Sequence, residues 1–413
     1  MANKPKIRFK GFDDAWEQRK LGELAEIVGG GTPSTSMGSY WDGDIDWYAP
    51  AEIGEQIYLE SSQRKITEKG LNKSSAKILP IGTVLFTSRA GIGKTAILLK
   101  EGCTNQGFQS IVPNKEKLDS YFIFTRSEEL KRYGETVGAG STFAEVSGKQ
   151  MADMELMMPK TTLEQQQIGE YFSKLDHLIT LHQRKCDQMN ELKKYMLTKM
   201  FPQNGSKVPE IRFDGYTDDW EQRKLSELAS MHARIGWQNL RTSEFLDVGD
   251  YMLITGTDFE DGKVNYSTCH YVEKERYDQD KNIQIKNGSI LITKDGTLGK
   301  VAYVEGLSMP ATLNAGVFNV EIKNKNETDG RYLFQFLKAP FLMDYVAQKA
   351  TGGTIKHLNQ NILVDFPISS PSKEEQTKIG EYFSSIDHLI TLHQSKCENL
   401  KNLKKYMLRN MFV

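Results

Sequence analysis

The chain has 413 residues, which is enough for two or three domains that each bury a core of their own. Hydrophobic residues make up 38% and aromatic residues 10% of the sequence, and this composition argues against wholesale disorder. The 53 Lys and Arg residues nearly balance the 54 Asp and Glu residues, so any contact with nucleic acid has to come from local clusters of charge.

The chain begins with one copy of a duplicated segment. Residues 7–25 match residues 211–229 at 14 of 19 positions. A second pair of segments, 168–201 and 379–412, matches at 24 of 34 positions. The order is therefore a short segment, a divergent block and a near-identical segment, and then the same again, which indicates a tandem pair of domains.

Both divergent blocks are rich in Gly and in turn signals. The block at residues 26–160 contains short apolar runs at 84–86 and 96–99, which predict strands. The block at residues 230–371 contains corresponding runs at 289–292 and 301–304. Each block is therefore predicted to be an α+β domain that carries loops on a small sheet.

A Gly-hinged loop is expected between the two strands of each block, at residues 88–94 and 294–300. Arg89 of the first loop can bond the edge of a guanine, and Asp295 of the second can accept a hydrogen bond from cytosine N4. Lys94 and Lys300 occupy equivalent places, which suits contact with phosphate. The alternative is that both loops lie on the surface and their charges are merely solvated.

A few polar and aromatic residues outside the loops are further candidates for DNA contact. Tyr40 and Trp41 follow a flexible run and either pack on sugar and phosphate or cap a sheet. Gln106 resembles an adenine-reading residue in type only, and Lys356 and His357 lie on a polar loop. The complete set of candidates is Thr87, Ser88, Arg89, Lys94, Gln106, Tyr40, Trp41, Lys294, Asp295, Thr297, Lys300, Lys356 and His357.

The near-identical segments place apolar residues in alternating steps of four and three, which predicts a coiled-coil seam on two helices of about 35–40 residues. We expect these helices to pack on each other and to run antiparallel. The predicted seam residues are Ile168, Phe172, Leu175, Ile179, Ile379, Phe383, Ile386 and Ile390.

Polar and off-seam positions on these helices leave alternatives open. His182 with Cys186, and His393 with Cys397, either form a polar layer that fixes the register, which we favour, or bind zinc together. Apolar positions outside the seam serve either the helices of a partner or the core of the globular blocks. These positions are Leu178, Leu181, Tyr195, Leu197, Leu389, Leu392, Tyr406 and Leu408.

The sequence contains no recognisable catalytic constellation. Residues 91–95 resemble a phosphate loop, but Ser88 replaces a required glycine, and a strand is predicted where the helix would start. No two prolines are adjacent, as the Asn/Asp-Pro-Pro-aromatic loop of an adenine methyltransferase would need. We therefore expect a non-catalytic chain that has no catalytic residue and no cofactor of its own.

Several features of the sequence bear on the location of the protein. No apolar run approaches the ~20 residues of a membrane span, and the basic start of the chain lacks the apolar core of a secretory signal. The four cysteines are far apart and form no C-x-x-C pattern, which favours reduced thiols. We expect a cytoplasmic protein that has no membrane partner.

The alternation of two divergent blocks with two near-identical helices resembles the specificity subunits of type I restriction-modification systems. Pro159 with residues 163–168, and Pro371 with residues 374–379, look like the Pro…Glu-Gln…Ile entry to the helices of that family. Residues 31–34, Gly-Thr-Pro-Ser, look like its first-domain signature, which the second block lacks. The resemblance covers nearly the whole chain.

This resemblance implies a division of labour. Each block would be a target-recognition domain for one half of a bipartite site in double-stranded DNA, and the helix pair would set the gap. Two modification subunits would methylate adenine with S-adenosylmethionine, and two restriction subunits would add a motor-nuclease that uses ATP and Mg. The expected domains are 1–160 (recognition domain 1 with the first repeat segment), 161–205 (helix 1), 206–371 (recognition domain 2 with repeat segment 211–229) and 372–413 (helix 2).

Two other functions remain open at this point. A protein-only coiled-coil scaffold would use the two divergent blocks to bind proteins, and a salt-titrated DNA-binding assay separates it from the DNA-binding function. A stand-alone enzyme would show methylation, nicking or ATPase activity without partners. The sequence does not give the target bases, the spacer length or the assignment of domains to half-sites.

Overall fold

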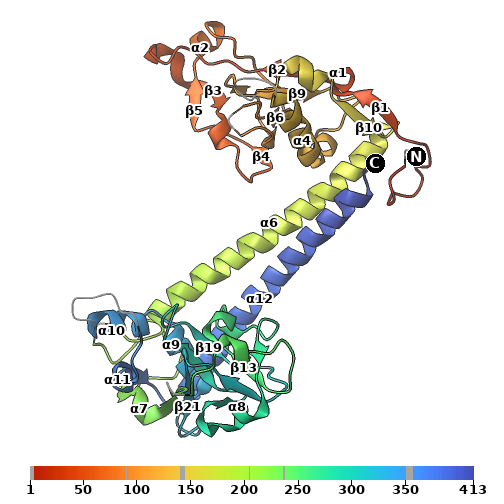
Figure 1. The fold of residues 1–413 in the computed structure, drawn as a ribbon. Coiled ribbons are helices and arrows are strands. Elements are labelled where there is room, and N and C mark those ends of the chain that lie inside the picture. Colours follow the sequence, from red (N-terminus) through yellow and green to blue (C-terminus); the bar gives the residue numbers. More distant parts are fainter. Residues whose placement is uncertain (1–3, 90, 140–144, 204, 236–237, 350–356) are drawn as a thin grey trace. The chain divides into compact units, whose positions relative to one another are not determined.

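The computed structural model describes residues 4–89, 91–139, 145–203, 205–235, 238–349 and 357–413. It confirms the predicted α+β class with two long helices, and it contains two compact units (Figure 1). Unit 1 comprises Met1–Gln183 and Gln394–Val413, and unit 2 comprises Arg184–His393. The units divide within the long helices, whereas the domain boundaries expected from the sequence lie near the helix ends. Each unit therefore holds a globular domain and part of both long helices.

Short strands and helices build the globular part of unit 1. The strands are β1 (Glu17–Lys20), β2 (Ala25–Gly29), β3 (Trp41–Tyr48), β4 (Tyr58–Leu59), β5 (Arg64–Ile66), β6 (Val84–Phe86), β7 (Thr95–Leu98), β8 (Cys103–Thr104), β9 (Gln109–Pro113) and β10 (Glu155–Met158). The short α-helices are α1 (Leu21–Leu24), α2 (Glu68–Asn72), α3 (Ser120–Thr125), α4 (Ser127–Gly138) and α5 (Gly148–Ala152). The strands form a five-stranded sheet of order β2-β9-β6-β7-β4, a three-stranded sheet of order β5-β3-β8 and the antiparallel pair β1-β10.

The globular part of unit 2 follows the same plan. Its strands are β11 (Glu221–Lys224), β12 (Ala229–His232), β13 (Met252–Ile254), β14 (Phe259–Glu260), β15 (Lys263–Val264), β16 (His270–Tyr271), β17 (Gln284–Ile285), β18 (Ile290–Thr293), β19 (Val301–Tyr303), β20 (Ala311–Leu313), β21 (Val317–Ile322) and β22 (Pro367–Ser370). Its short α-helices are α7 (Leu225–Leu228), α8 (Lys274–Asp278), α9 (Gly330–Lys338), α10 (Phe341–Lys349) and α11 (Gln360–Val364). The sheets have the orders β12-β21-β18-β19, β16-β13-β20-β17, β14-β15 and β11-β22.

A buried hairpin lies at the centre of each globular domain, β6-β7 in unit 1 and β18-β19 in unit 2. Val84 and Phe86 of β6 belong to the core cluster that also contains residues of the long helices, whereas Leu85 belongs to a second cluster. The same alternation occurs along β18. Successive side chains of a strand point to opposite faces, so a continuous apolar run marks a strand that is buried on both faces. The loop at the hairpin tip therefore starts from a rigid base.

The duplicated segments fasten each globular domain to the start of a long helix, α6 (Thr162–Lys199) in unit 1 and α12 (Lys373–Asn410) in unit 2. Arg8 donates two hydrogen bonds to Glu164 on α6, at 2.6 and 2.8 Å. Arg212 donates two to Glu375 on α12, both at 2.8 Å. Because each carboxylate is 1% exposed, the bidentate pairing is what offsets the cost of burying its charge.

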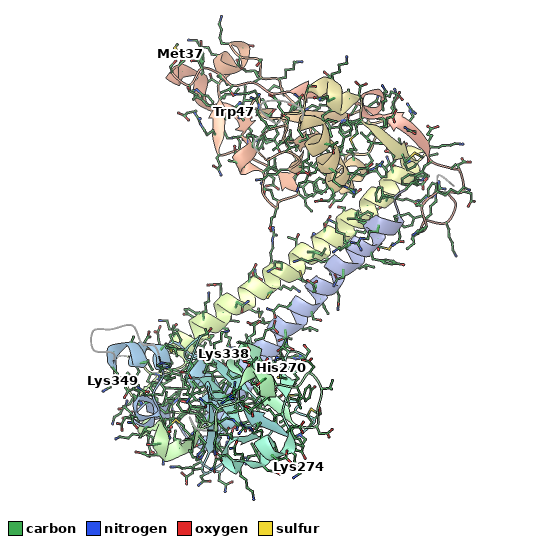
Figure 2. All side chains as sticks on the ribbon, in the orientation of Figure 1. Met37, Trp47, His270, Lys274, Lys338 and Lys349 are labelled. Carbon is green, nitrogen blue, oxygen red and sulfur yellow. The ribbon has the colours of Figure 1, made fainter. Side chains whose placement is uncertain are left out.

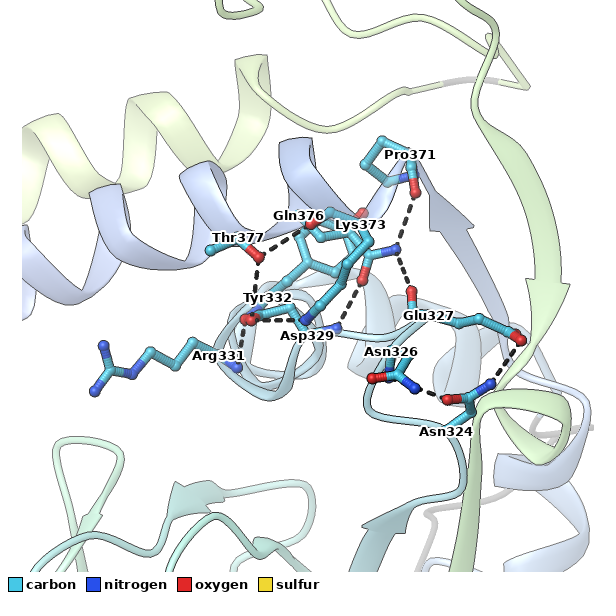
Figure 3. A network of polar contacts seen from close by, with 10 residues as sticks. All are labelled: Asn324, Asn326, Glu327, Asp329, Arg331, Tyr332, Pro371, Lys373, Gln376 and Thr377. Atoms are coloured by element: carbon cyan, nitrogen blue, oxygen red, sulfur yellow. Dashed lines mark hydrogen bonds and ion pairs between the residues drawn. The ribbon is translucent and has the colours of Figure 1, made fainter.

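The glutamine after Glu375 secures the neighbouring helix α9 (Figure 3). Gln376 accepts a hydrogen bond from the backbone N–H of Asp329 at 2.9 Å. It donates to the carbonyls of Glu327 at 3.1 Å and Pro371 at 2.9 Å. The Asp329 carboxylate in turn accepts from the backbone N–H of Tyr332 at 3.0 Å and so caps α9. One side chain thus ties the start of α12 to the cap of α9.

Unit 1 repeats this arrangement with equivalent residues. Gln165 accepts from the backbone N–H of Asp119 at 3.1 Å and donates to the carbonyl of Lys117 at 3.0 Å. Asp119 caps α3 through the backbone N–H of Phe122 at 2.8 Å. A Cβ at Gly169 would come within 2.6 Å of the Asp119 carboxylate, so only glycine allows α6 to approach this cap so closely.

The long helices run antiparallel where they pack within each unit. In unit 1, Phe172 of α6 contacts Phe412 at a ring separation of 6.0 Å, and Asp176 accepts from Lys404 of α12 at 2.6 Å. In unit 2, Lys193 of α6 donates to Asp387 of α12 at 2.6 Å. The two ion pairs use equivalent residues of the two repeats, with the roles of the helices exchanged.

Most of the predicted seam residues are buried in the core of their unit. Ile179 is half-buried, and the others have exposed fractions of 7% or less. The buried seam residues of unit 1 are Ile168, Phe172 and Leu175, and those of unit 2 are Ile379, Phe383, Ile386 and Ile390. Because these residues also contact the globular domains, the seam joins each domain to the helices as well as helix to helix.

Candidate nucleic-acid interface

A threonine closes the loop at the tip of the central hairpin in each unit. In unit 1, the Thr87 hydroxyl accepts the backbone N–H of Lys94 at 3.0 Å and donates to the carbonyl of Gly91 at 2.7 Å. In unit 2, the Thr293 hydroxyl accepts the backbone N–H of Lys300 at 2.9 Å and donates to the carbonyl of Thr297. A hydroxyl can accept and donate at once, so one side chain holds both ends of the loop.

A glycine near the end of each loop allows the loop to lie close to a helix. Gly93 has a φ of +98° and Gly299 a φ of +71°, a region that disfavours other residues. A Cβ at Gly93 would come within 2.3 Å of Lys131 on α4, and one at Gly299 within 2.1 Å of Met343 on α10. The loops are therefore held against helices of their own unit.

Two further chain segments clamp each loop through its backbone. The N–H of Ser88 donates to the carbonyl of Gly107 at 2.8 Å, and the carbonyl of Ser88 accepts from the N–H of Val146 at 3.0 Å. The corresponding bonds of unit 2 join Lys294 to Gly316 and to Leu358, both at 2.8 Å. Three segments that are distant in sequence thus meet at equivalent places in both units. We call this arrangement the loop frame.

The equivalent position of the loop carries a cation in unit 1 and an anion in unit 2, and each has an ionisable partner. In unit 1, the Arg89 guanidinium lies 3.2 Å from Glu145 and donates to the carbonyl of Gln106 at 2.8 Å. In unit 2, the equivalent loop position is Asp295, whose carboxylate lies 2.5 Å from Nδ1 of His357. These four side chains are each at least 40% exposed, so a ligand can reach them.

The structure places the other predicted loop contacts at different depths. Lys94, Lys300 and Thr297 are exposed. Thr87 and Ser88 are 0% exposed, so in this conformation they support the loop from beneath and present no surface to DNA. Lys294 is half-buried, with its ammonium 5.5 Å from the ring centroid of Phe318.

The candidates outside the loops are also divided. Gln106 is exposed and joins the loop frame through its carbonyl. Trp41 is 6% exposed, donates to the carbonyl of Ser34 at 3.1 Å and packs edge-on against Trp47, which is a core role; Tyr40 is half-buried. Lys356 lies outside the described residues.

Glu145 was not among the residues expected from the sequence. It lies 56 positions after Arg89 and belongs to no periodic pattern. Alignment of the two repeats could have identified Glu145. It directly precedes Val146, as His357 directly precedes Leu358, and the backbone N–H groups of Val146 and Leu358 bind the two loop frames at equivalent places.

Two properties of the described residues concern ligands and membranes. Cys186 and Cys397 are buried, and the described ranges contain no group of three His, Cys, Asp or Glu side chains that is placed to hold a metal ion. We propose no metal site there. None of the helices in the described part of the chain combines the length and apolarity that crossing a membrane requires.

Comparison with known proteins identifies the family. The family model described as Type I restriction modification DNA specificity domain matches residues 13–191 and 217–402. The chain is 25% identical over 410 residues to the type I restriction enzyme MjaIX specificity subunit of Methanocaldococcus jannaschii, which covers 95% of this chain and 91% of that protein. It is 22% identical over 408 residues to the MjaVIII specificity subunit of the same organism, with the same coverage of 95% and 91%.

A solved structure has the same fold. The S subunit of a type I restriction-modification system from M. genitalium matches with a TM-score of 0.65 and 15% identity over 99% of both chains. The family model matches the chain twice, once over each globular domain and its following helix. This chain therefore belongs to the specificity subunits of type I restriction-modification systems, and it carries two DNA specificity domains.

Proposed function

We propose that each globular domain recognises one half of a bipartite site in double-stranded DNA through its loop frame. The observation that carries this proposal is that two frames with matching backbone hydrogen bonds carry different side chains at the equivalent loop position, Arg89 in one and Asp295 in the other. A shared scaffold with different tips is what two recognition domains for different sequences need. Arg89 suits the paired acceptors of guanine, and Asp295 suits the amino group of cytosine.

Lys94 and Lys300 would position these tips on the duplex. Both are exposed, both follow the glycine that lies against a helix, and both have their backbone N–H held by the loop threonine. A cation at the same place in both domains suits phosphate, which is present whatever the base sequence. Sequence discrimination would then rest on the residues that differ, and affinity on those that match.

The long helices would set the spacer and carry the partners. Each has 38 residues, which corresponds to a length of about 57 Å at 1.5 Å per residue. Apolar side chains remain exposed at equivalent positions of both repeats, and such side chains suit the helices of a partner. These residues are Leu178, Leu181 and Tyr195 in the first repeat and Leu389, Leu392 and Tyr406 in the second. Leu197, in contrast, is buried in the core of unit 2.

Because these exposed apolar positions occur in both repeats, we propose that two copies of the modification subunit bind this chain, and that two restriction subunits join the complex. The chain itself would be non-catalytic. The modification subunits would use S-adenosylmethionine, and the restriction subunits ATP and Mg.

The test is genome-wide mapping of methylated adenine in cells that carry this chain with its modification subunit. We expect one split motif with a fixed gap. Replacing residues 26–160 with the corresponding block of a relative should change the bases of one half-site only. A change in both halves after this replacement would contradict the assignment of one domain to each half-site.

A further inference from the structure

A group of cations on β5, on α2 and in the residues that follow α2 in unit 1 has no part in the loop frame. Its members are Arg64, Lys69, Lys73 and Lys77, and we call them the basic patch. All four side chains are exposed. Among the described residues, no carboxylate lies within 4.0 Å of any of their charged nitrogens, whereas the neighbouring Lys65 pairs with the buried Asp46 at 3.4 Å. The four cations of the basic patch therefore form no direct ion pair within the described part of the protein, although the exposed Glu68 lies on α2 and the exposed Asp42 and Asp44 lie on β3, which pairs with β5.

The corresponding region of unit 2 has a different charge balance. Around α8, Lys274 pairs with Asp278 and Arg276 pairs with Glu244, each at 2.5 Å. Lys286, which follows β17, pairs with Glu321. Cations occur in both regions, and most of those in unit 2 have partners of opposite charge, although the exposed Lys281, three residues after α8, forms no ion pair with a described carboxylate. Cations without an ion pair are thus more numerous in this region of the first recognition domain than in the corresponding region of the second.

Aromatic rings hold part of the basic patch in place. The guanidinium carbon of Arg64 lies 3.8 Å from the ring centroid of Trp41, and the ammonium of Lys69 lies 5.9 Å from that of Tyr40. Trp41 itself packs against Trp47 with a ring separation of 5.1 Å. An arginine that is stacked on a buried ring has lost much of its freedom already, so a further anion costs little extra ordering.

A short series of packing contacts and hydrogen bonds connects the basic patch to the loop frame. A Cβ at Gly31 would come within 2.3 Å of the Ala76 backbone nitrogen, so the chain that bears Lys73 and Lys77 packs directly on the 29–34 run. The adjacent Thr32 donates its hydroxyl to Gln106, and the Gln106 carbonyl accepts from Arg89. Figures 1 and 2 show α2, β3 and β5, with Met37 and Trp47, gathered in one part of unit 1.

We propose that the basic patch binds the phosphate backbone of the duplex whose bases the first recognition domain reads. This inference rests on the proposed function and adds a surface to it. Four separate cations along one chain segment suit a polyanion whose charges recur every ~3.4 Å of each strand, and Arg64 can bond one phosphate with two nitrogens. The contact is independent of base sequence. It adds affinity to one half-site, so the two half-sites contribute unequally to binding.

The experiment measures binding of a fluorescent duplex that contains the mapped target, as a function of salt, to the complex of this chain with its modification subunit. The test variant is Lys69→Gln, Lys73→Gln, Lys77→Gln. The matched control is Lys6→Gln, Lys10→Gln, Lys115→Gln, which removes three exposed cations of the same unit that lie outside the basic patch. The single variant Arg64→Gln provides a second test in case the triple variant folds poorly.

The logarithm of the DNA association constant falls linearly with the logarithm of the salt concentration, and each lost phosphate contact should make this slope shallower by about 0.9. The triple variant should therefore make it shallower by about 2.7, and Arg64→Gln by about 0.9. The control should keep the original slope, and the methylated sequence should not change in any variant. An unchanged slope in both patch variants would overturn the inference. So would weaker binding of the modification subunit at an unchanged slope, which would indicate a protein partner. If the unsubstituted complex bound all DNA sequences equally, the proposed function itself would fail.

Discussion

The buried ion pair between Arg212 and Glu375 should be the main electrostatic interaction that holds the second recognition domain against helix α12. The side chains are 12% and 1% exposed and are joined by two hydrogen bonds of 2.8 Å. The Glu375 carboxylate raises the pKa of Arg212, so the arginine stays charged. Glu375→Gln would retain the volume but leave the guanidinium facing an amide. Removing one partner of a buried pair costs 3–5 kcal/mol, and residual access to water at Arg212 favours the lower end, about 3 kcal/mol.

Hydrogen exchange of peptides that cover β11 and β22 measures this change locally. A loss of about 3 kcal/mol corresponds to roughly 100-fold faster exchange. Glu227→Gln is the matched control, because Glu227 pairs with Arg223 at 3.4 Å with side chains 49% and 31% exposed. Such an exposed pair contributes at most about 1 kcal/mol. Peptides of β1 and β10 report on the intact Arg8–Glu164 pair. Equal effects of the two substitutions, or equally faster exchange in β1 and β10, would refute the reasoning.

Three further outcomes are expected. Lys94→Glu and Lys300→Glu should each weaken DNA binding broadly and lower its salt dependence without changing the methylated sequence; a changed sequence would mean that these lysines contact bases. Gly299→Ala should abolish specific DNA binding, because it combines a strained φ with a clash against Met343. Gly296→Ala, which has the same φ of +71° but no neighbour within 4 Å, should have a milder effect. Equal effects on DNA binding would show that the clash is unimportant. Burial, followed by the charge of Lys193, lowers the pKa of Lys338 (labelled in Figure 2) from 10.5 to about 8. Between pH 8 and pH 10.5 the unfolded chain therefore binds more protons at this group than the folded chain does, and the free energy of unfolding rises with pH. Lys338→Met should therefore be more stable relative to the unsubstituted chain at pH 7 than at pH 10 in urea unfolding, and a constant difference would contradict the shift.

Periodic features of the sequence predict much of the fold. Steps of four and three place Phe172 and Phe383 on the buried face of their helices, because residues at that spacing share one side of an α-helix. The apolar run at 84–86 becomes β6 because both faces of that strand are covered. These features depend on neighbours in sequence, so a local pattern is enough to predict them.

Pairings between distant residues could not be predicted in the same way. Asp176 and Lys404 are 228 positions apart, and heptad spacing places Lys404 in the seam without identifying its partner. Arg89 could be proposed as a DNA contact from its type and its loop, but its partner Glu145 comes from a distant segment whose Val146 binds the loop backbone. Thr87 has the residue type of a DNA contact, yet its place at the end of a buried strand commits its hydroxyl to the loop.

We propose above all that two loop frames with matched backbones specify two different half-sites. Methylated-adenine mapping in cells that carry Arg89→Gln, or separately Asp295→Asn, with the modification subunit tests it most directly. Each substitution should relax one base position, in one half-site only, and the two variants should affect opposite halves. A variant that alters bases in both halves, or two variants that alter none, would contradict the claim.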